Sequence, residues 1–408
     1  MKYLTLDDVK VKDKTVLVRV DFNSPVDPNS KKVLDDVRIR AHGETTIKEL
    51  AEKGAKVVIL AHQGRKGDPD FIPLKQHAEI LGKILGRSVK YVDDIFGDKA
   101  KNAIKSLKSG EILVLDNVRN FAAETKEGTP EDHAKTELVQ NLAPLAQLFV
   151  NDAFAAAHRA HVSIIGFTAV LPSAAGRIME RELKSLSKVL ENPEKPCVFI
   201  LGGAKGDDSL EISKYVLSKR IADFVLTGGV VGHIFLAAKG FNLGKPNMGF
   251  LEKKELMGLV PGIKELMQKY PDKIKTPKDL AVEVNGKRKE ISVNELPTNY
   301  PIFDVGAKTV EDYAKIIKNA KSIVVSGPMG VYENKEFVYG TKRIFAEIAN
   351  SEAFSLAGGG HTIAALQELK LSDKISYVST AGGALIEFLM GKKLPGVVAL
   401  EKAAARKA

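Results

Sequence analysis

Positively charged and polar side chains follow each predicted strand in the first half of the 408-residue sequence. They come directly after short β-branched runs or from the loops beside them. Since the carboxyl ends of parallel strands meet at one edge of a sheet, we expect these groups to share one crevice. Guanidinium groups are permanently charged planar forks that match phosphate and carboxylate oxygens. The pattern therefore predicts a site for a small, multiply charged anion, with Asp21, Asn23, Arg38, His62, Arg65, Arg119 and Arg159 as its candidate residues.

Glycine-rich loops follow the predicted strands of the second half instead. Glycine lets backbone N–H groups approach a phosphate closely, and a helix that starts there adds its positive end. We therefore expect these loops to bind a nucleotide. None of them is a Walker A sequence, and none is a dinucleotide-binding G-x-G-x-x-G followed by an acidic residue about 20 positions on. The four loops are Gly202–Gly206, Thr227–Gly229, Ser326–Gly330 and Gly358–Thr362.

The elements that must hold these loops are short apolar strands that alternate with helical patterns in both halves. Continuous apolar runs are typical of parallel strands buried on both faces. The sequence therefore predicts an α/β fold of two doubly wound parallel-sheet lobes. Asn285-Gly286, between two alternating segments, predicts a tight hairpin in the second lobe. The predicted strands are 15–20, 56–61, 111–115 and 147–150 in the first half, and 197–201, 223–227, 322–326, 354–357 and 376–380 in the second.

The stretch 171–196 predicts a long helix between the two lobes. Its apolar residues recur at three- and four-residue steps, so they share one face of a helix. Ser173 after Pro172 is the expected N-cap, and Pro193 ends the pattern. We expect an N-terminal anion-binding domain over residues 1–172, an interdomain helix over 173–192, a nucleotide-binding domain over 193–385 and a C-terminal segment over 386–408.

Composition restricts the partners. The net charge is +10, with 61 Lys and Arg against 51 Asp and Glu, but acidic residues are interspersed throughout. Trp is absent and aromatic residues make up 6%, so base-stacking platforms are not evident and we expect no nucleic acid partner. No apolar run approaches the roughly 20 residues that span a bilayer, so we expect no membrane association and a cytoplasmic location. The single cysteine, Cys197, lies in an apolar run and is expected to be a buried thiol.

Several motifs carry a family resemblance along essentially the whole chain. The first half has RVDFNSP at 19–25, DDVRI at 35–39, AHQGRK at 61–66, DNVRN at 116–120 and NDAFAAAHRAH at 151–161. The second half has GGAKGDDS, SGPMGVYE, GGGHT and STAGGA. In this order and with these residues, the sequence resembles the phosphoglycerate kinases, and its predicted central helix is similar to the interdomain helix of that family.

The resemblance implies reversible phosphoryl transfer between 1,3-bisphosphoglycerate and ADP, giving 3-phosphoglycerate and ATP, by direct in-line transfer after hinge closure. It implies Mg²⁺ carried mainly by the nucleotide, with the metal ligands unknown, and a monomer, with a dimer left open. The implied substrate-binding residues are Asp21, Phe22, Asn23, Arg38, His62, Gln63, Gly64, Arg65, Arg119 and Arg159. The implied nucleotide-binding residues are Lys205, Glu333, Gly358, Gly359, Gly360, His361 and Thr362. Arg38, Lys205, Gly359 and Gly360 would be catalytic.

Three residues of the second half depart from the family pattern. Ser209 replaces a lysine, His361 replaces the aspartate of the GGGDT motif, and Ser326 replaces an asparagine. These changes keep a second function open, that of a nucleotide- or anion-binding homologue with impaired catalysis. The glycine loops alone would also allow a Rossmann-type dehydrogenase.

Overall fold

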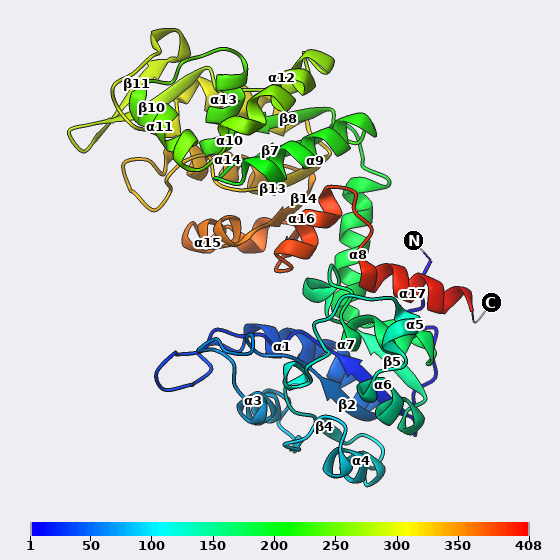
Figure 1. Ribbon diagram of the computed structural model, residues 1–408. Coiled ribbons are helices and arrows are strands. Elements are labelled where there is room, and N and C mark those ends of the chain that lie inside the picture. The colour runs from blue at the N-terminus through cyan, green and yellow to red at the C-terminus, as the bar shows by residue number, and fades with distance from the viewer. Residues whose placement is uncertain (1, 407–408) are drawn as a thin grey trace. The chain divides into compact units, whose positions relative to one another are not determined.

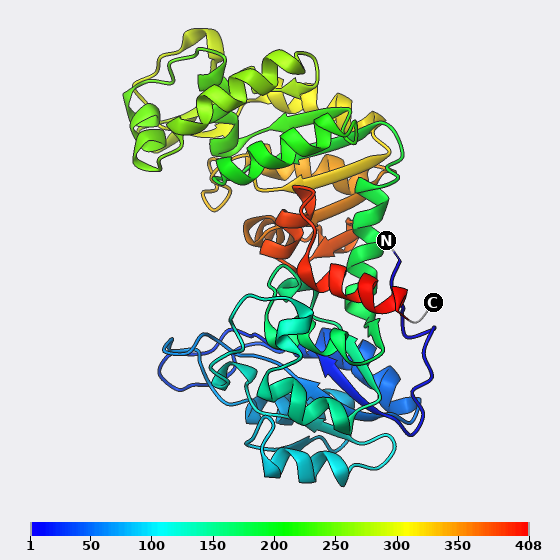
Figure 2. The same ribbon diagram turned by 45° about the vertical axis from the view of Figure 1, so that its right-hand side comes forward.

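The computed structural model describes residues 2–406, which form two compact units. The N-terminal unit comprises Met1–Leu183 with Lys393–Ala408, and the C-terminal unit comprises Lys184–Lys392. Each unit contains a six-stranded sheet, and helices lie on both faces of each sheet (Figures 1 and 2). The α/β fold class expected from the sequence is thus confirmed. No helix within residues 2–406 combines the length and the apolar character needed to span a membrane.

The sheet of the N-terminal unit is parallel throughout, in the order β3-β4-β2-β1-β5-β6. All four predicted strands are present, and two short edge strands were not predicted. Both edge strands have few residues, so their sequences show no clear alternation. The strands are β1 (Thr15–Arg19), β2 (Lys56–Leu60), β3 (Lys90–Tyr91), β4 (Ile112–Val114), β5 (Leu148–Asn151) and β6 (Ser173–Ala175).

Successive residues of these strands pack into two different core layers. Val16 and Val18 of β1 join side chains from α1, α2 and α3, whereas Leu17 joins side chains from α4, α6 and α7. A strand buried on both faces must be apolar at every position, which explains the continuous apolar runs. The helices are α1 (Val37–His42), α2 (Lys48–Glu52), α3 (Lys75–Leu85), α4 (Asp98–Lys105), α5 (Pro130–His133), α6 (Glu137–Leu142) and α7 (Val162–Ile165).

The C-terminal unit repeats this plan with a parallel sheet in the order β15-β14-β13-β7-β8-β9. All five predicted strands of the second half are present, and the short β9 was not predicted. Cys197, the first residue of β7, is completely buried. The strands are β7 (Cys197–Leu201), β8 (Phe224–Thr227), β9 (Ile274–Lys275), β13 (Ser322–Ser326), β14 (Phe354–Gly358) and β15 (Tyr377–Ser379).

Helices cover both faces of this second sheet. Side chains of α13, α14 and α15 share one core cluster with β7, β8 and β13. Helices α9, α10, α12 and α16 form a contiguous group through α9. The helices are α9 (Gly206–Ser218), α10 (Gly229–Ala238), α11 (Lys245–Lys253), α12 (Val260–Lys269), α13 (Ala307–Asn319), α14 (Tyr339–Asn350), α15 (Gly360–Glu368) and α16 (Gly383–Leu389).

The predicted hairpin is also present. Strands β10 (Asp279–Val284) and β11 (Lys287–Ser292) pair antiparallel, and β12 (Ile302–Val305) completes a three-stranded sheet. The two residues of the turn, Asn285 and Gly286, have φ angles of 51° and 75°. Positive φ at both central positions is the backbone that Asn-Gly favours in a two-residue hairpin.

The predicted central helix begins later than expected. Helix α8 runs over Arg177–Leu190, and Ser173 is the first residue of strand β6, so the prediction of Ser173 as N-cap is wrong. Ser173 pairs with Phe149 of β5, and its hydroxyl donates a hydrogen bond to the carbonyl of Leu171. Pairing along the edge of the sheet keeps residues 173–175 extended, although the spacing of apolar residues in this stretch also fits one face of a helix.

A carboxylate from a distant strand end caps helix α8 instead. Asp152 is completely buried, and its Oδ1 accepts hydrogen bonds from the backbone N–H groups of Ile178 at 2.8 Å and Met179 at 3.2 Å. Its Oδ2 lies 2.6 Å from Nδ1 of His42. A Cβ atom on Gly176 would lie 2.2 Å from the Asp152 Oδ1, so only glycine leaves room for this cap.

The end of the chain returns to the N-terminal unit as helix α17 (Pro395–Ala405), coloured red in Figure 1. The helix packs against β6, α7 and the 3-10 helix η5 (Gly166–Ala169). The backbone N–H of Gly396 donates to the carbonyl of Ala157 at 2.8 Å. The chain therefore passes between the units twice, inside α8 and again before α17.

We expect Asp152→Asn to lower the free energy of unfolding by about 1–3 kcal/mol, because the amide cannot replace a charged acceptor at the start of α8 and beside His42. Urea titration followed by circular dichroism measures this change. Glu191→Gln, at the other end of the same helix on an exposed position, is the control and should change stability by less than about 0.5 kcal/mol. Equal urea concentrations at the midpoint of unfolding for Asp152→Asn and the parent protein would contradict the assignment of Asp152 as the cap.

Candidate functional site

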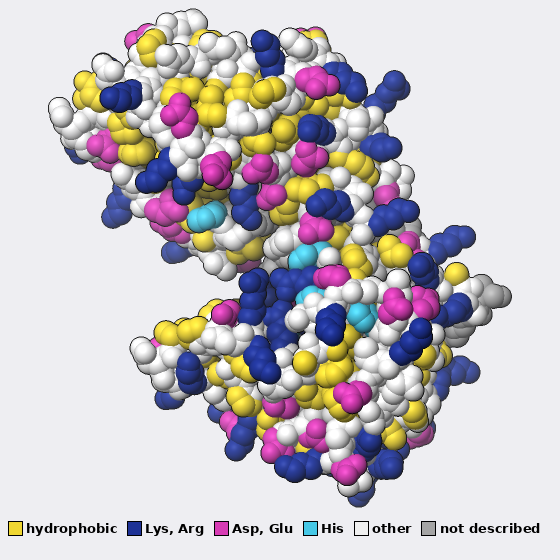
Figure 3. All heavy atoms as spheres, in the orientation of Figure 1, with side chains coloured by type: hydrophobic (Ala, Val, Ile, Leu, Met, Phe, Trp, Pro, Cys, Tyr) yellow, Lys and Arg dark blue, Asp and Glu magenta, His cyan; other side chains and the backbone are white. Residues whose placement is uncertain are grey.

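Three of the predicted arginines line one cavity of about 430 Å³ in the N-terminal unit. We call it the arginine pocket. Arg65, Arg119 and Arg159 reach it from three different loops, and Glu127 is the only acidic residue in its lining. On the N-terminal unit, Figure 3 shows Lys and Arg side chains gathered beside histidines. The remaining lining residues were not predicted, although two of them belong to the family motifs: Lys66, Phe121, Ala122, Thr125, Glu127 and His161, with Lys66 and His161 in the motifs.

The histidines near this pocket are held neutral. His62 is buried, and burial together with the charges of Arg19 and Arg119 lowers its pKa well below the usual range. Burial, reinforced by Arg159, lowers the pKa of His161 to about 3. Burial also lowers the pKa of Arg119 to about 10, which still leaves this guanidinium charged at pH 7. The positive charge of the pocket therefore comes from Arg and Lys, while the imidazoles supply hydrogen bonds.

The loop after β1 lies next to this pocket. Asp21 is buried and forms an ion pair with Arg38, and its Oδ1 accepts from the backbone N–H of Asn23. Oδ1 of Asn23 accepts from the N–H of Gly64 at 2.8 Å, and the Gly64 carbonyl accepts from Arg119. This chain of hydrogen bonds connects the predicted residues of three loops. Arg38 does not line the arginine pocket, but its charge reaches His62.

Two predicted substrate-binding residues have side chains in the interior. Phe22 is completely buried in the core, where it stacks on His77 with ring centroids 6.4 Å apart. Gln63 is also fully buried, and its side chain accepts from the Ser24 N–H at 2.8 Å and donates to the Ser24 carbonyl at 3.0 Å. These side chains hold the loops together and are not accessible to a ligand.

A buried ionic network supports the pocket from beneath. Arg19 is 2% exposed and donates to Oγ of Ser163 at 2.8 Å, and its Nη2 lies 2.9 Å from Nδ1 of His62. Glu124 is 1% exposed and accepts from both the hydroxyl and the backbone N–H of Ser163. Burial raises the pKa of Glu124 to about 7. Neither charged residue was predicted to have this role, because Arg19 has the pattern of a strand residue and Glu124 that of a polar loop.

The second site is a smaller pocket of about 130 Å³ in the C-terminal unit, which we call the glycine-loop pocket. Its lining contains five of the predicted nucleotide-binding residues, Lys205, Gly359, Gly360, His361 and Thr362. Helices α9 and α15 begin at this pocket, so their N-terminal N–H groups and positive dipole ends are available to an anion. The other lining residues are Gly202, Gly203, Ala204, Asp208, Ser209, Ile212, Ser326, Gly327, Pro328, Gly382, Gly383 and Ile386.

The glycine loops after β7 and β13 touch at the point where the strand order reverses. The Gly203 N–H donates to the Pro328 carbonyl at 2.8 Å. A Cβ on Gly202 would lie 2.2 Å from that carbonyl, and one on Gly327 would lie 2.2 Å from the carbonyl of Gly202. Backbone packing therefore requires glycine at these two positions. A glycine after a strand has the same sequence pattern whether it is needed for packing or for ligand binding.

The remaining predicted nucleotide-binding residues lie beside the glycine-loop pocket. Gly358 ends strand β14 and is buried, and a Cβ there would overlap Leu385. Oε1 of Glu333 lies 3.9 Å from Nδ1 of His361, and both side chains are exposed. Oγ1 of Thr362 accepts from the N–H of Gly327 at 2.7 Å, so Thr362 holds the loop after β13.

The residues at this pocket fit a metal ion that arrives with a nucleotide. Within residues 2–406, no group of three or more His, Cys, Asp or Glu side chains is arranged to hold a metal ion. Asp208 is the one carboxylate in the lining, and Lys205 lies 3.9 Å from it. Mg²⁺ commonly binds through one or two carboxylates plus substrate phosphates and keeps several waters. Asp208 is the residue of this lining suited to such a shared ion.

Comparison with known proteins identifies the family. The family model described as phosphoglycerate kinase matches residues 6–392. The chain belongs to the phosphoglycerate kinase family. The phosphoglycerate kinase of Methanothermobacter thermautotrophicus is 49% identical over 401 residues, covering 98% of this chain and 97% of that protein. The phosphoglycerate kinase of Methanococcus maripaludis is 50% identical over 409 residues, covering 98% of each.

Solved structures agree with this family membership. The crystal structure of the phosphoglycerate kinase from Pyrococcus horikoshii OT3 has a TM-score of 0.87 and 41% identity, covering 99% of this chain and all of that one. That of Coxiella burnetii has a TM-score of 0.85 and 33% identity. These similarities favour the kinase over the binding protein with impaired catalysis and over the dehydrogenase that the glycine loops alone allowed.

Two of the departures from the phosphoglycerate kinase pattern, Ser209 and His361, face the glycine-loop pocket, and Ser326 also lines it. Ser209 is 5% exposed in the first part of helix α9. His361 is exposed in the first turn of α15. The three changes therefore fall together in one pocket, and the arginine pocket contains none of them.

The raised pKa of Glu124 predicts a pH-dependent stability. The folded pKa of about 7 exceeds the usual 4.5, so this group stabilises the fold below pH 4.5 and its contribution is lost as the pH rises through 7. We expect the parent protein to lose on the order of 2 kcal/mol relative to Glu124→Gln between pH 5 and 8. Urea titrations across this range measure the difference. Glu127→Gln, an exposed acid of the same pocket, is the control, and parallel pH profiles for Glu124→Gln and the parent would exclude the effect.

Proposed function

We propose that this member of the phosphoglycerate kinase family catalyses phosphoryl transfer between ATP and the carboxylate of 3-phosphoglycerate, and the reverse transfer from 1,3-bisphosphoglycerate to ADP. The observation that carries the proposal is the arginine pocket, where three arginines and a lysine face one cavity with a single acidic residue. Permanently charged guanidinium groups suit a ligand with phosphate and carboxylate groups. The enzyme is then a phosphotransferase with a carboxyl group as acceptor.

We assign the phosphoglycerate to the arginine pocket and the loops beside it. Arg65, Arg119 and Arg159 would bind its anionic groups, with His62 and Asn23 at the neighbouring loops. Asp21 would act on the ligand through Arg38, whose guanidinium it pairs with. Gly64 connects Asn23 to Arg119 through its backbone N–H and carbonyl, and Phe22 and Gln63 position the loops from the interior.

We assign the nucleotide to the glycine-loop pocket. Lys205 is largely exposed beside the first turn of α9, which suits a side chain that binds a mobile phosphate. Gly359 and Gly360 present backbone N–H groups at the start of α15. Glu333, beside His361, is placed to reach a ribose hydroxyl. Mg²⁺, held mainly by nucleotide oxygens with Asp208 nearby, would neutralise the phosphate charge.

The chemistry requires positioning more than proton transfer. A carboxylate is already ionised at pH 7, so the attacking oxygen needs no general base. The loose transition state of phosphoryl transfer requires in-line alignment and positive charge at the equatorial oxygens. Arg38, Lys205 and the N–H groups of Gly359 and Gly360 would supply that charge.

The two ligands are assigned to different units, so reaction requires closure that brings their reacting atoms together and excludes water. Neither ligand alone interacts with both units, so only the two together have the differential affinity that favours a closed state. A cytoplasmic location and a monomeric state remain predictions from the sequence.

We expect Arg38→Ala to lower kcat by about 10²–10³-fold while the KM for ATP changes little, because one preorganised donor to the transferred group is lost. A coupled assay with 3-phosphoglycerate, ATP and Mg²⁺ measures both constants and also tests the proposed function. Absence of turnover by the parent protein at saturating substrates would exclude the kinase.

The matched control is Arg40→Ala. Arg40 lies on the same helix α1 and forms ion pairs with Asp36 and Glu44 at the surface. It should retain kcat within a factor of two. A change of less than about threefold for Arg38→Ala would remove Arg38 from the catalytic group.

We expect His361→Asp to tighten binding of Mg·ADP severalfold, because a carboxylate is a better ligand for a hard cation than an imidazole. Titration calorimetry with and without Mg²⁺ separates the metal-dependent part of the affinity. His361→Asn keeps a polar side chain without the charge and is the control. Weaker or unchanged Mg·ADP binding by His361→Asp would mean that another residue already fills this role.

A further inference from the structure

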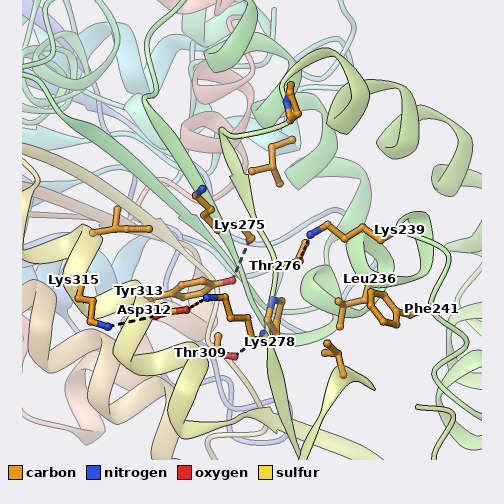
Figure 4. A pocket seen from close by; sticks show the side chains of 15 residues that line it. Leu236, Lys239, Phe241, Lys275, Thr276, Lys278, Thr309, Asp312, Tyr313 and Lys315 are labelled. Carbon is orange, nitrogen blue, oxygen red and sulfur yellow. Dashed lines mark hydrogen bonds and ion pairs between the residues drawn. The ribbon is translucent and has the colours of Figure 1, made fainter. Parts of the chain in front are cut away.

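A cavity of about 520 Å³ in the C-terminal unit is separate from the glycine-loop pocket and shares no lining residue with it. We call it the α10–α13 pocket, after the two helices that contribute to its walls (Figure 4). Its volume falls in the range of small-molecule sites. Its lining consists of Leu236, Lys239, Phe241, Pro271, Ile274, Lys275, Thr276, Pro277, Lys278, Val293, Thr309, Asp312, Tyr313, Lys315 and Ile316.

The backbone around this pocket is fixed by buried hydrogen bonds. The hydroxyl of Tyr313 donates to the carbonyl of Thr227 at 2.7 Å and to that of Lys275 at 3.1 Å. The hydroxyl of Thr227 also donates to the Lys275 carbonyl, at 3.0 Å. Thr309 accepts from the N–H of Lys278 at 2.9 Å. The segment after β9 is therefore held on α13, and the pocket is largely preformed.

Four lysines and one aspartate surround the pocket, which leaves a net charge of +3 at neutral pH. Figure 4 shows Asp312 between Lys278 and Lys315, and it forms ion pairs with both. Within residues 2–406, neither Lys239 nor Lys275 forms an ion pair with a carboxylate. The ammonium of Lys275 lies over the ring of Phe224, 5.4 Å from its centroid, and that of Lys239 donates to Thr276, so neither charge is neutralised and both can attract an anionic ligand.

Lys239 and Lys275 also repel each other. Lys239 donates to the hydroxyl of Thr276 at 2.8 Å, as Figure 4 shows, so its ammonium stays at the pocket wall. Burial there, together with the charge of Lys275, lowers the pKa of Lys239. An anion bound between them would replace this repulsion with attraction.

The same pocket has an apolar side. Leu236 and Phe241 lie together near Lys239 in Figure 4, and Ile274 and Ile316 add further apolar surface. An aromatic face beside unneutralised lysines suits a ligand with a flat ring and negatively charged groups. Inorganic phosphate alone would leave this apolar wall uncovered.

We propose that the α10–α13 pocket is a second ligand site for a nucleoside phosphate or a similar ring-bearing organic phosphate. Its phosphates would lie at Lys239 and Lys275, and its ring against Phe241. The site is independent of the catalytic function assigned above, since it uses none of those residues. It predicts that one chain binds two molecules of ADP, one at each pocket.

Site-resolved lysine acetylation, quantified by mass spectrometry, tests the location with ADP as the probe. We expect 5 mM ADP to reduce acetylation of Lys239 and Lys275 at least threefold. Lys253 and Lys264, which are exposed on α11 and α12 of the same unit, serve as internal controls and should be unaffected. Unchanged labelling of Lys239 and Lys275, or equal protection of all four lysines, would overturn the proposal.

Titration calorimetry with ADP tests the binding itself. We expect two sites in the parent protein and in the control Lys253→Gln/Lys264→Gln, and a second site weakened at least tenfold in Lys239→Gln/Lys275→Gln, with kcat unchanged. Tripolyphosphate, which lacks a ring, should bind this second site at least fivefold more weakly than ADP. A single site in the parent protein, or a second site that survives the double substitution, would overturn the proposal, and equal binding of tripolyphosphate would overturn the role of Phe241.

Discussion

A single buried carboxylate, that of Asp152, connects the loop that carries Asp21 to helix α8 through His42. Its Oδ1 caps the first turn of α8, and its Oδ2 lies 2.6 Å from Nδ1 of His42. The other nitrogen of His42 accepts from the backbone N–H of Asp21, the residue that pairs with Arg38. Because a buried carboxylate must have all its oxygens satisfied, these contacts are mutually dependent. Movement at the start of α8 and movement of the loop that carries Asp21 are therefore linked within one unit.

The arginine pocket places several positive charges close together in the N-terminal unit, and the repulsion between them opposes folding. Two structural features reduce the free-energy cost of these charges. Burial lowers the pKa of Arg19, and the nearby Glu124 offsets part of this effect. His62 and His161 are held neutral, so the imidazoles add no further positive charge. The remaining excess is carried by arginines whose delocalised charge is weakly hydrated. Under the proposed function, the negative charges of the phosphoglycerate would complete this electrostatic balance.

In the C-terminal unit, glycines allow two loops to pack closely beside one pocket. Gly202 and Gly327 allow the loops after β7 and β13 to touch, which exposes the starts of α9 and α15 to one small pocket. Ser209, Ser326 and His361, which depart from the family pattern, contribute to the lining of this pocket, whereas the loops touch through backbone groups. Under the proposed function, phosphate would therefore bind mainly to backbone groups of these loops.

The sequence by itself determined the α/β class, nine strands of the two parallel sheets, the hairpin at Asn285-Gly286 and the grouping of arginines and glycines at strand ends. Apolar periodicity and parallel-strand geometry are local properties, which is why the sequence is sufficient for them. Only the tertiary structure decided that Ser173 is paired in β6 and that Asp152 caps α8, since both depend on partners more than 20 residues away. It also decided which charges are buried: Arg19 and Glu124 read as ordinary polar residues until packing removes water from them. Likewise, Lys239 and Lys275 are 36 positions apart, and only the fold of β9 against α10 and α13 brings them to one cavity.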